Sequence, residues 1–518
     1  MGEAEMSHGG SIFAHKTRQR VLMAVIAAAT GIEMLENGMF VFASSHIAGG
    51  VGAAPEEYAF VSTLYAVAGI LVILKQRWLA ARLGYRTFLA GALTLMAFGA
   101  GLCGMAHTPT ELAVARFVLG LGAGSLFTAS RILINLCFAP ELRLRALLFF
   151  TYGFFGGQIS APLLASYLVD HFLWSSVFFA IVPIALAGAL ASWFVIPDFR
   201  ERLRDEGEFE MRGIVFFAAG VLFVEVMMQR SRFDFFSNPL HLLELCLVGA
   251  ICAIGYMWHQ YSHHKPLIDF RVLVRNPVYV LGLGGYAVYY FFSYSTSYLF
   301  PIYMQQGLNW SVEHTGYLQA VASVTSLVVA VMYTMARPKF VQLKPFVLLG
   351  YLCLLGYAFL LSQTYPGVSS QWLILPMVLS GLGGVFAMIP IAELTFRGMD
   401  EYVFQHGYQT KNIVRQLVSS MSVSVMAVLM QDRQAVFMHQ LTPSMTPLNP
   451  AYNAAVSQAQ QAFGASVDPA TASHMASAWV GGLASQQALV LACVNVFFGF
   501  ACLAALCAAF MAVQRRLR

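Results

Sequence analysis

The chain has 518 residues, of which 58% are hydrophobic and only 11% are charged. Soluble globular proteins carry about 25% charged residues, so this composition excludes an ordinary soluble enzyme. The 43 glycines and 41 phenylalanines indicate a membrane protein with many spans, because glycine lets membrane helices approach closely. The net charge of +5 gives no indication of a nucleic-acid partner.

The polar residue types show no pattern typical of a metal site or an enzyme. All eight cysteines lie in apolar segments without metal-ligand spacing, so we interpret them as small packing residues. No nucleophile motif and no phosphate-binding loop is present. We therefore expect no metal, no cofactor and no enzymatic activity. A membrane-embedded enzyme or sensor is the remote alternative.

The hydrophobic runs predict an all-α integral membrane protein. A spanning helix needs about 20 mostly apolar residues, and the chain contains fourteen such runs. They cover residues 20–46, 58–76, 86–106, 111–135, 144–168, 173–196, 212–229, 240–260, 278–304, 314–336, 345–362, 371–396, 408–430 and 486–513.

The basic residues predict the orientation of these runs. If the N-terminus is cytoplasmic, 24 of the 30 Lys and Arg residues fall in cytoplasmic segments, and three fall in outer loops. This count places Lys411, near the start of the run 408–430, on the cytoplasmic side. Positive charges are retained on the cytoplasmic side, so both termini are expected there.

Three connections are unusual. Residues 197–211 form a charged linker, and residues 263–277 alternate apolar and basic positions, which favours a short helix on the membrane surface. Residues 431–485 form a polar outer segment, in which 451–463 and 471–485 are rich in Ala, Gln and Ser and favour helices outside the bilayer. An outer segment of this size is either a docking surface or a tether.

The first hydrophobic run carries two acids, Glu33 and Glu36, which share one helix face because they are three residues apart. An acid in mid-bilayer costs at least about 2.5 kcal/mol, so acids there usually line a cavity or carry protons. The alternative is a hydrogen bond to a neighbouring helix. Arg116, in the fourth run, either faces a carboxylate or a wet cavity, or extends its side chain to the interface.

The fifth run contains a stripe of small residues on one helix face. Gly153, Gly157, Ala161 and Ala165 recur every fourth position, and Pro162 is expected to kink the helix. Such a stripe with a kink suits a place where two halves slide or rock.

Later runs contain further residues that could have a functional or a structural role. The tyrosine-rich run 278–304 favours either a ligand cavity or a lipid-facing surface. Glu225 is expected to make a structural contact with Arg230 or His241.

Six short motifs occur along the chain in a characteristic order. They are Glu33-Met-Leu-Glu36-Asn-Gly38, Arg116-x-x-x-Gly120-x-Gly122, Gly157-x-x-x-Ala161-Pro162-x-x-Ala165-Ser166, Pro266-Leu-Ile-Asp-Phe-Arg271, Leu299-Phe-Pro-Ile-Tyr-Met-Gln-Gln306 and Arg415-Gln-Leu417. In this order the chain resembles the fourteen-span drug:proton antiporters of the major facilitator superfamily over nearly its whole length.

The resemblance implies a domain organisation with two six-helix bundles and an inserted helical hairpin. We expect an N-terminal tail 1–19, a first bundle 20–197, a linker 198–211, a hairpin 212–262, a cytoplasmic amphipathic segment 263–277, a second bundle 278–513 that includes the outer loop 431–485, and a tail 514–518.

The resemblance also implies roles for individual residues. The proton-coupling residues are Glu33, Glu36 and Arg116; the hinge motif comprises Gly153, Gly157, Ala161, Pro162 and Ala165; the inner-loop gate comprises Arg82, Gly84 and Arg86; and the possible cavity lining comprises Tyr290, Tyr294, Gln305 and Arg415. One departure is Ala81, where the family has an acid that latches the halves. A latch would therefore need other acids, for which Asp198, Glu201 and Asp205 are candidates.

The function implied is multidrug efflux, and hence drug resistance, by a transporter of the cell inner membrane. Export of hydrophobic compounds would run on the proton gradient by alternating access, without a cofactor. The implied partners are protons, hydrophobic substrates, lipid and, in a Gram-negative host, a periplasmic adaptor with an outer-membrane channel. The alternative is a major facilitator transporter that imports a specific metabolite or works without protons.

Overall fold

The structure is a computed structural model that describes residues 16–197, 211–262, 268–336, 342–464 and 468–514. The described residues form helices and no strands, as the composition predicts. The helices in the first part of the chain are α2 (Lys16–Phe42), α3 (Ser44–Gly50), α4 (Pro55–Leu83), α5 (Tyr85–Gly104), α6 (Pro109–Ala123), α7 (Leu126–Cys137), α8 (Pro140–His171) and α9 (Ser176–Val195). The later ones are α10 (Met211–Asp234), α11 (Pro239–Ser262), α12 (Phe270–Arg275), α13 (Pro277–Pro301), η1 (Ile302–Gly307), α14 (Val312–Ala336), α15 (Lys344–Ser362), α16 (Ser370–Phe396), α17 (Glu401–Leu441), η3 (Thr442–Ser444), α18 (Pro450–Gly464) and α19 (Pro469–Val513).

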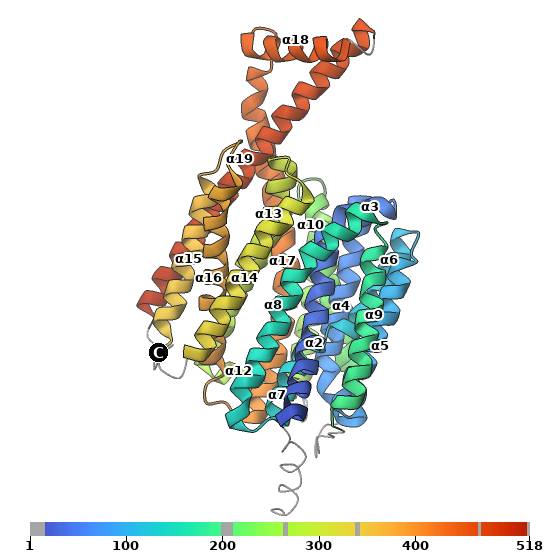
Figure 1. Ribbon diagram of the computed structural model, residues 1–518, viewed down its shortest axis with the longest axis vertical. Coiled ribbons are helices and arrows are strands. Elements are labelled where there is room, and N and C mark those ends of the chain that lie inside the picture. Colours follow the sequence, from blue (N-terminus) through green and yellow to red (C-terminus); the bar gives the residue numbers. More distant parts are fainter. Residues whose placement is uncertain (1–15, 198–210, 263–267, 337–341, 465–467, 515–518) are drawn as a thin grey trace, which may run out of the picture.

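The described helices agree with the fourteen predicted spans. Thirteen segments are long and apolar enough to cross a membrane, one of them formed by α6 and α7 together. The remaining predicted span is α13, which lies beside the others in the bundle (Figure 1). The six tyrosines of α13 lower its mean hydropathy, although its 25 residues are long enough to span.

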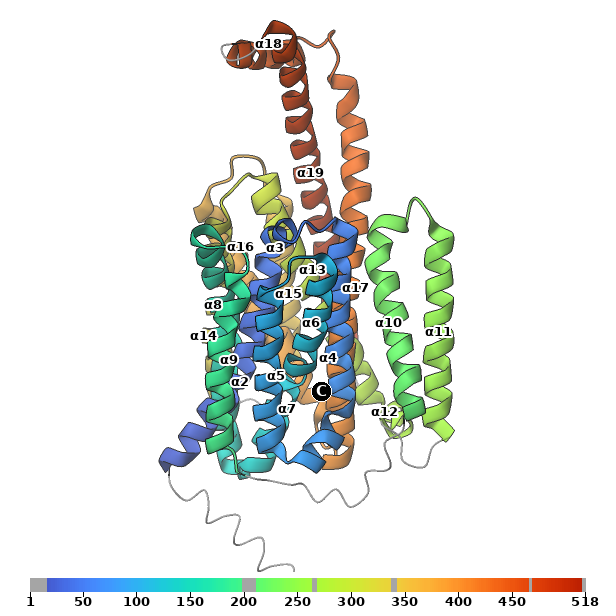
Figure 2. The ribbon, with the colours of Figure 1, turned by 90° about the vertical axis from the view of Figure 1, so that its right-hand side faces the viewer.

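The buried side chains form two large hydrophobic clusters. One contains residues between 22 and 196, and the other contains residues between 286 and 511. Helices α10 and α11 stand as a pair beside the bundle, and α10 packs against α4 and α17 (Figure 2). The short helix α12 accounts for part of the predicted surface segment 263–277, of which residues 263–267 lie outside the described residues.

The predicted fourth span is two helices, not one. Helix α6 ends at Ala123 and α7 begins at Leu126, and the break falls at Gly124 and Ser125. A Cβ at Gly124 would overlap the backbone of Gly69 in α4, so the chain approaches α4 closely at the break. The break leaves the first N–H groups of α7 without acceptors inside the helix.

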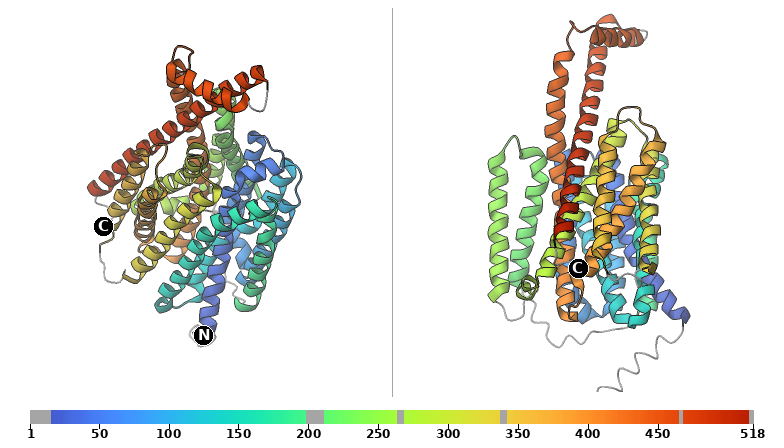
Figure 3. Two further views of the ribbon diagram at one scale, coloured as in Figure 1. Left: turned by 45° about the horizontal axis from the view of Figure 1, so that its top comes forward. Right: turned by 90° about the vertical axis from the view of Figure 1, so that its left-hand side faces the viewer.

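Two helices project far beyond the bundle. Helix α17 has 41 residues and α19 has 45, which is roughly 60 Å each at 1.5 Å per residue, twice the thickness of the bilayer core. Their projecting ends carry α18 across the top, and the segment 431–485 is named the protrusion below (Figures 1 and 3). The predicted helix 451–463 is α18, and the predicted helical residues 471–485 are the start of α19, which continues through the bundle to Val513.

Helix α2 begins at the end of the bundle away from α18, and this end is named the terminal end below (Figure 1). The opposite end is named the protrusion end.

Candidate functional site

Helix α2 carries both acids into the interior of the bundle. Glu33 and Glu36 are each only 2% exposed, so neither side chain lies at a membrane interface. The two carboxylates bind different partners from different helices, and each pairing has its own geometry.

Glu36 forms an ion pair with Arg116. The guanidinium Nη1 of Arg116, on α6, donates to Glu36 Oε1. Arg116 is 1% exposed and lies between two rings, with its Cζ 3.8 Å from the centroid of Phe40 and 4.1 Å from that of Tyr65. This geometry contradicts the alternative in which Arg116 extends to the interface. A buried arginine is stabilised by a carboxylate and by aromatic faces together.

Glu33 is bound by a helix N-terminus and by a second arginine. The backbone N–H of Phe127, in the first turn of α7, donates to Glu33 Oε2 at 2.6 Å. Arg415 Nη2, on α17, lies 3.6 Å from Glu33 Oε1. The break between α6 and α7 therefore supplies a free N–H and the positive end of a helix dipole to a buried acid, an arrangement that the sequence did not indicate.

The ion pairs of the two acids join different parts of the chain. Glu36 and Arg116 both lie in the first third of the chain, whereas Arg415, the partner of Glu33, comes from α17, late in the chain. A change in the charge of Glu33 alters an attraction between the first and the last third of the chain. A change in the charge of Glu36 acts within the first third.

A third buried cation, Lys411, lies one turn from Arg415 on α17. Lys411 does not lie in a connecting segment, because α17 begins at Glu401 and the Lys411 side chain is only 2% exposed inside the bundle. The Nζ lies 4.2, 5.1 and 5.5 Å from the ring centroids of Tyr408, Tyr286 and Phe127.

The predicted cavity residues are only partly brought together. Tyr290 is buried and stacks on Tyr286 at 5.6 Å, and Tyr294 lies 6.2 Å from Tyr290, so these rings follow α13 beside Lys411. Arg415 belongs to the same region, since its Cζ is 4.8 Å from the ring of Phe127. Gln305 lies in η1, fifteen residues beyond Tyr290, which is roughly 22 Å along the helix toward the protrusion end.

The small-residue stripe of α8 packs on α2, the helix that carries the acids. A Cβ at Gly153 would overlap the carbonyl oxygen of Ala27, and a Cβ at Gly157 would overlap that of Gly31. Ala161 and Ala165 continue the buried face, and the Cβ of Ala161 contacts Gly38.

Helix α8 runs through Pro162 without ending there. Gly316 of α14 approaches this point, because a Cβ on it would lie 3.6 Å from the carbonyl oxygen of Pro162 and 3.4 Å from Phe42. Helices α2, α8 and α14 thus meet at the protrusion end.

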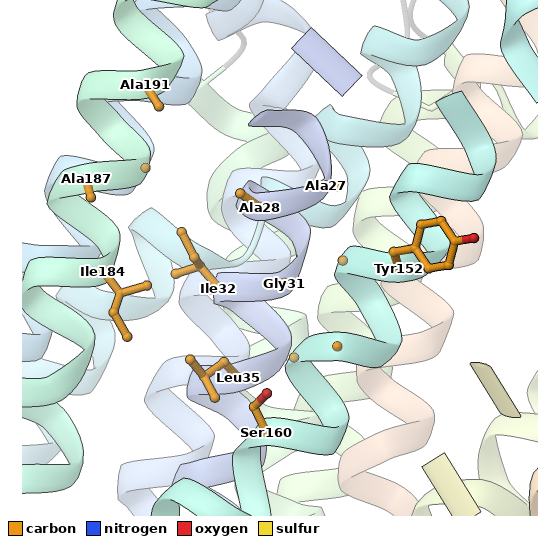
Figure 4. A pocket seen from close by; sticks show the side chains of 14 residues that line it. Ala27, Ala28, Gly31, Ile32, Leu35, Tyr152, Ser160, Ile184, Ala187 and Ala191 are labelled. Atoms are coloured by element: carbon orange, nitrogen blue, oxygen red, sulfur yellow. The ribbon is translucent and has the colours of Figure 1, made fainter. Parts of the chain in front are cut away.

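A surface groove of about 490 Å³ is lined by residues of α2, α8 and α9 (Figure 4). Its lining is almost wholly apolar and includes Gly31, Ile32 and Leu35, with the exposed side chains of Tyr152 and Ser160 at its edge. The acids are not among the lining residues, so the groove is not the acid site.

The predicted inner-loop residues make contacts within the first part of the chain. Gly84 joins α4 to α5 with φ of +81°, a conformation that glycine adopts without strain. Arg86 Nε donates to the carbonyl of Ile196 at 2.7 Å, and the Arg82 guanidinium lies 4.6 Å from the ring centroid of Trp78. The candidate acids Asp198, Glu201 and Asp205 lie outside the described residues.

The contacts between early and late helices at the terminal end come from polar residues of α17. Gln409 Nε2 donates to the carbonyls of Ile73 and Leu74, at 2.9 and 2.6 Å. Asn412 Nδ2 donates to Thr128 Oγ1 at 2.8 Å. These residues are not among those predicted from the sequence, although so many polar side chains at the start of the hydrophobic run 408–430 were a usable signal.

Glu225 does not pair with Arg230 or His241 as predicted. Both of these residues bind Asp234 instead, through Arg230 Nε at 2.8 Å and His241 Nδ1 at 2.9 Å. Glu225 is 0% exposed on α10, the helix that packs against α17.

The chain is similar to several multidrug exporters over most of its length. It is 24% identical over 458 residues to the multidrug export protein EmrB of Haemophilus influenzae, covering 88% of this chain and 89% of that protein. It is 22% identical over 487 residues to EmrB of Escherichia coli K12, covering 93% and 92%. The putative multidrug resistance protein MdtD of Yersinia enterocolitica is 24% identical over 436 residues, covering 83% and 89%.

Among solved structures, a bacterial homologue of the human lysosomal transporter Spinster, inward-facing and occupied, matches with a TM-score of 0.56 at 13% identity. The match covers 95% of this chain and 97% of that one, which shows a shared fold. The family model described as Major Facilitator Superfamily matches residues 26–423, and this chain belongs to that superfamily.

Proposed function

We propose that this protein exports hydrophobic, drug-like compounds across the bacterial inner membrane in exchange for protons. The multidrug exporters to which the chain is similar support the substrate class and the direction. The observation that carries the proton coupling is the pair of buried acids with separate cations, Glu36 with Arg116 and Glu33 with Arg415. Buried ionisable residues in membrane helices are the usual carriers of protons.

The mechanism follows from what protonation does to these pairs. A proton on Glu33 removes the attraction to Arg415, which lies on α17, and so weakens a contact between early and late helices. A proton on Glu36 frees Arg116 from its only ion-pair partner among the described residues. Under alternating access, uptake of protons from the outside and release to the cytoplasm would then be tied to opposite movement of the substrate.

The test is proton movement in proteoliposomes that contain the purified protein and a fluorescent pH indicator. Substrate-driven proton flux should fall at least about tenfold in Glu36→Gln and in Glu33→Gln, the range usual for loss of one proton-transfer group. Glu141→Gln is the matched control, because Glu141 is an exposed acid at the start of α8 and its flux should stay unchanged. Unchanged flux in both buried-site variants, or equal export with and without a pH gradient, would contradict the proposal.

We further propose that the protrusion binds a periplasmic adaptor protein that leads to an outer-membrane channel. The length of α17 and α19, and the exposed side chains of Leu448 (93%) and Trp479 (49%), support a docking surface rather than a tether. Gln434 and Ser485 face one another across α17 and α19, with Nε2 3.3 Å from Oγ, so a shorter connection can join the helices beyond this pair.

The adaptor proposal is tested by replacing residues 439–480 with a short Gly/Ser linker. Drug resistance of Gram-negative cells should be lost, whereas transport in proteoliposomes should be retained, because the acids and their cations lie far from the protrusion. Resistance equal to that of the unmodified protein would dismiss the adaptor.

A further inference from the structure

The side chain of Lys411 is buried without a counter-ion of its own. It is 2% exposed, and none of the described residues forms a hydrogen bond or ion pair with its Nζ. The carboxylate of Glu33, which is bound from the same helix by Arg415, already accepts from the Phe127 N–H. Among the described residues, Lys411 therefore has no carboxylate partner.

Aromatic rings stabilise this ammonium only in part. Tyr408, Tyr286 and Phe127 surround Nζ at 4.2 to 5.5 Å, which is the range of cation–π contacts. An ammonium has three N–H donors, however, and ring faces are weak acceptors for them. A buried charge is normally paired and hydrogen-bonded, so the site lacks an anionic acceptor.

We propose that Lys411 binds the negative group of an aromatic organic anion, such as a carboxylate or phenolate, whose rings stack on the tyrosines of α13. This inference rests on the proposed function, since the anion is the transported compound, and it specifies the substrate class. The stacked rings of Tyr286 and Tyr290 extend the aromatic wall away from Nζ, which matches a ligand with a charged end and a flat apolar body. A cationic ligand is disfavoured, because it would be buried beside Lys411 and Arg415.

The site is tested by direct binding, without any gradient, to the purified full chain in lipid nanodiscs. The probes are 2-naphthoate, its methyl ester and 2-naphthylmethylammonium, which share one ring system and differ in charge. Isothermal titration at pH 7 should show 2-naphthoate binding about tenfold more tightly than the ester, the gain expected from a hydrogen bond to a charged group. The ammonium probe should bind most weakly.

Substitutions then assign the effect to Lys411. Lys411→Met should weaken 2-naphthoate about tenfold and leave the ester unchanged, while Lys411→Arg should keep most of the preference for the anion. Arg433→Met is the matched control on the same helix, because Arg433 is half-exposed beside Asp432 and lies in the protrusion. Its affinities should equal those of the unmodified protein.

Two results would overturn the inference. One is equal affinity of the unmodified protein for 2-naphthoate and its ester, a measurement that needs no variant to fold. The other is a folded Lys411→Met protein that keeps the preference for the anion, which would leave Lys411 as a partner of Glu33 in another conformation. If anion binding depends on Lys411 but proton flux is absent, the site stands and the proton-coupled function fails.

Discussion

The buried charges of α2, α6 and α17 show how far single residues can be predicted. The cost of an unpaired charge in a membrane made a partner for Arg116 foreseeable, and the structure supplies it in Glu36. Which acid faces which arginine was not foreseeable, since that depends on helix rotation. The burial of Lys411 was not foreseeable either, because the apolar run begins only at residue 408, whereas α17 begins at Glu401, almost three turns before the lysine.

At this scale, Arg116→Met should destabilise the protein by about 3–5 kcal/mol, because it leaves the Glu36 carboxylate buried without its cation. The double variant Arg116→Met with Glu36→Gln should recover part of this loss, since the uncompensated charge is gone. Unfolding in detergent, followed by tryptophan fluorescence, measures both. A double variant no more stable than Arg116→Met would show that the arginine acts through its packing between Phe40 and Tyr65.

The ends of helices were predicted well where an apolar run gives way to polar residues, and poorly where it does not. The ends of α17 and α19 outside the bundle are polar or rich in alanine, so hydropathy stops at 430 and restarts at 486 although the helices continue. The break between α6 and α7 was missed because glycine and serine are ordinary residues in membrane helices. Each error concerns backbone continuity, which depends on neighbours and not on composition.

The packing of α8 on α2 offers a matched pair of adjacent glycines. Gly157→Ala should cost about 1–3 kcal/mol, because the new Cβ overlaps the carbonyl oxygen of Gly31. Gly156→Ala, where a Cβ meets no other atom within 4 Å, should be neutral or stabilise by up to about 1 kcal/mol through helix propensity. Unfolding in detergent distinguishes them. Equal effects of the two substitutions would mean that close approach to α2 does not stabilise the protein.

In the whole molecule, early and late helices contact one another at both ends of the bundle. Gln409 and Asn412 of α17 bind α4 and α7 at the terminal end, and Gly316 of α14 meets α2 and α8 at the protrusion end. The sequence predicted a departure from the family latch at Ala81, but it did not predict the hydrogen bonds of Gln409 and Asn412. Contacts between residues more than 280 positions apart follow from the folded arrangement and leave no local pattern in the sequence.

The proposed alternating access would require these terminal-end contacts to break, so weakening them should favour the state open at that end. The change is Gln409→Leu with Asn412→Leu, which removes three hydrogen bonds while keeping the side-chain size. Spin labels at Leu83 and Arg397, two exposed positions at ends of α4 and α16, report the separation in a background without cysteines.

Double electron–electron resonance should show a longer-distance component that is minor in the parent and increased in the variant, because each lost bond had favoured the closed end. Labels at two positions of the protrusion, Leu448 and Met475, serve as the control and should keep their distance distribution. If the longer component does not increase, Gln409 and Asn412 do not hold the terminal end closed, and the closure depends on the other contacts between α17 and α4, which include Arg77 Nη1 3.3 Å from His406 Nε2.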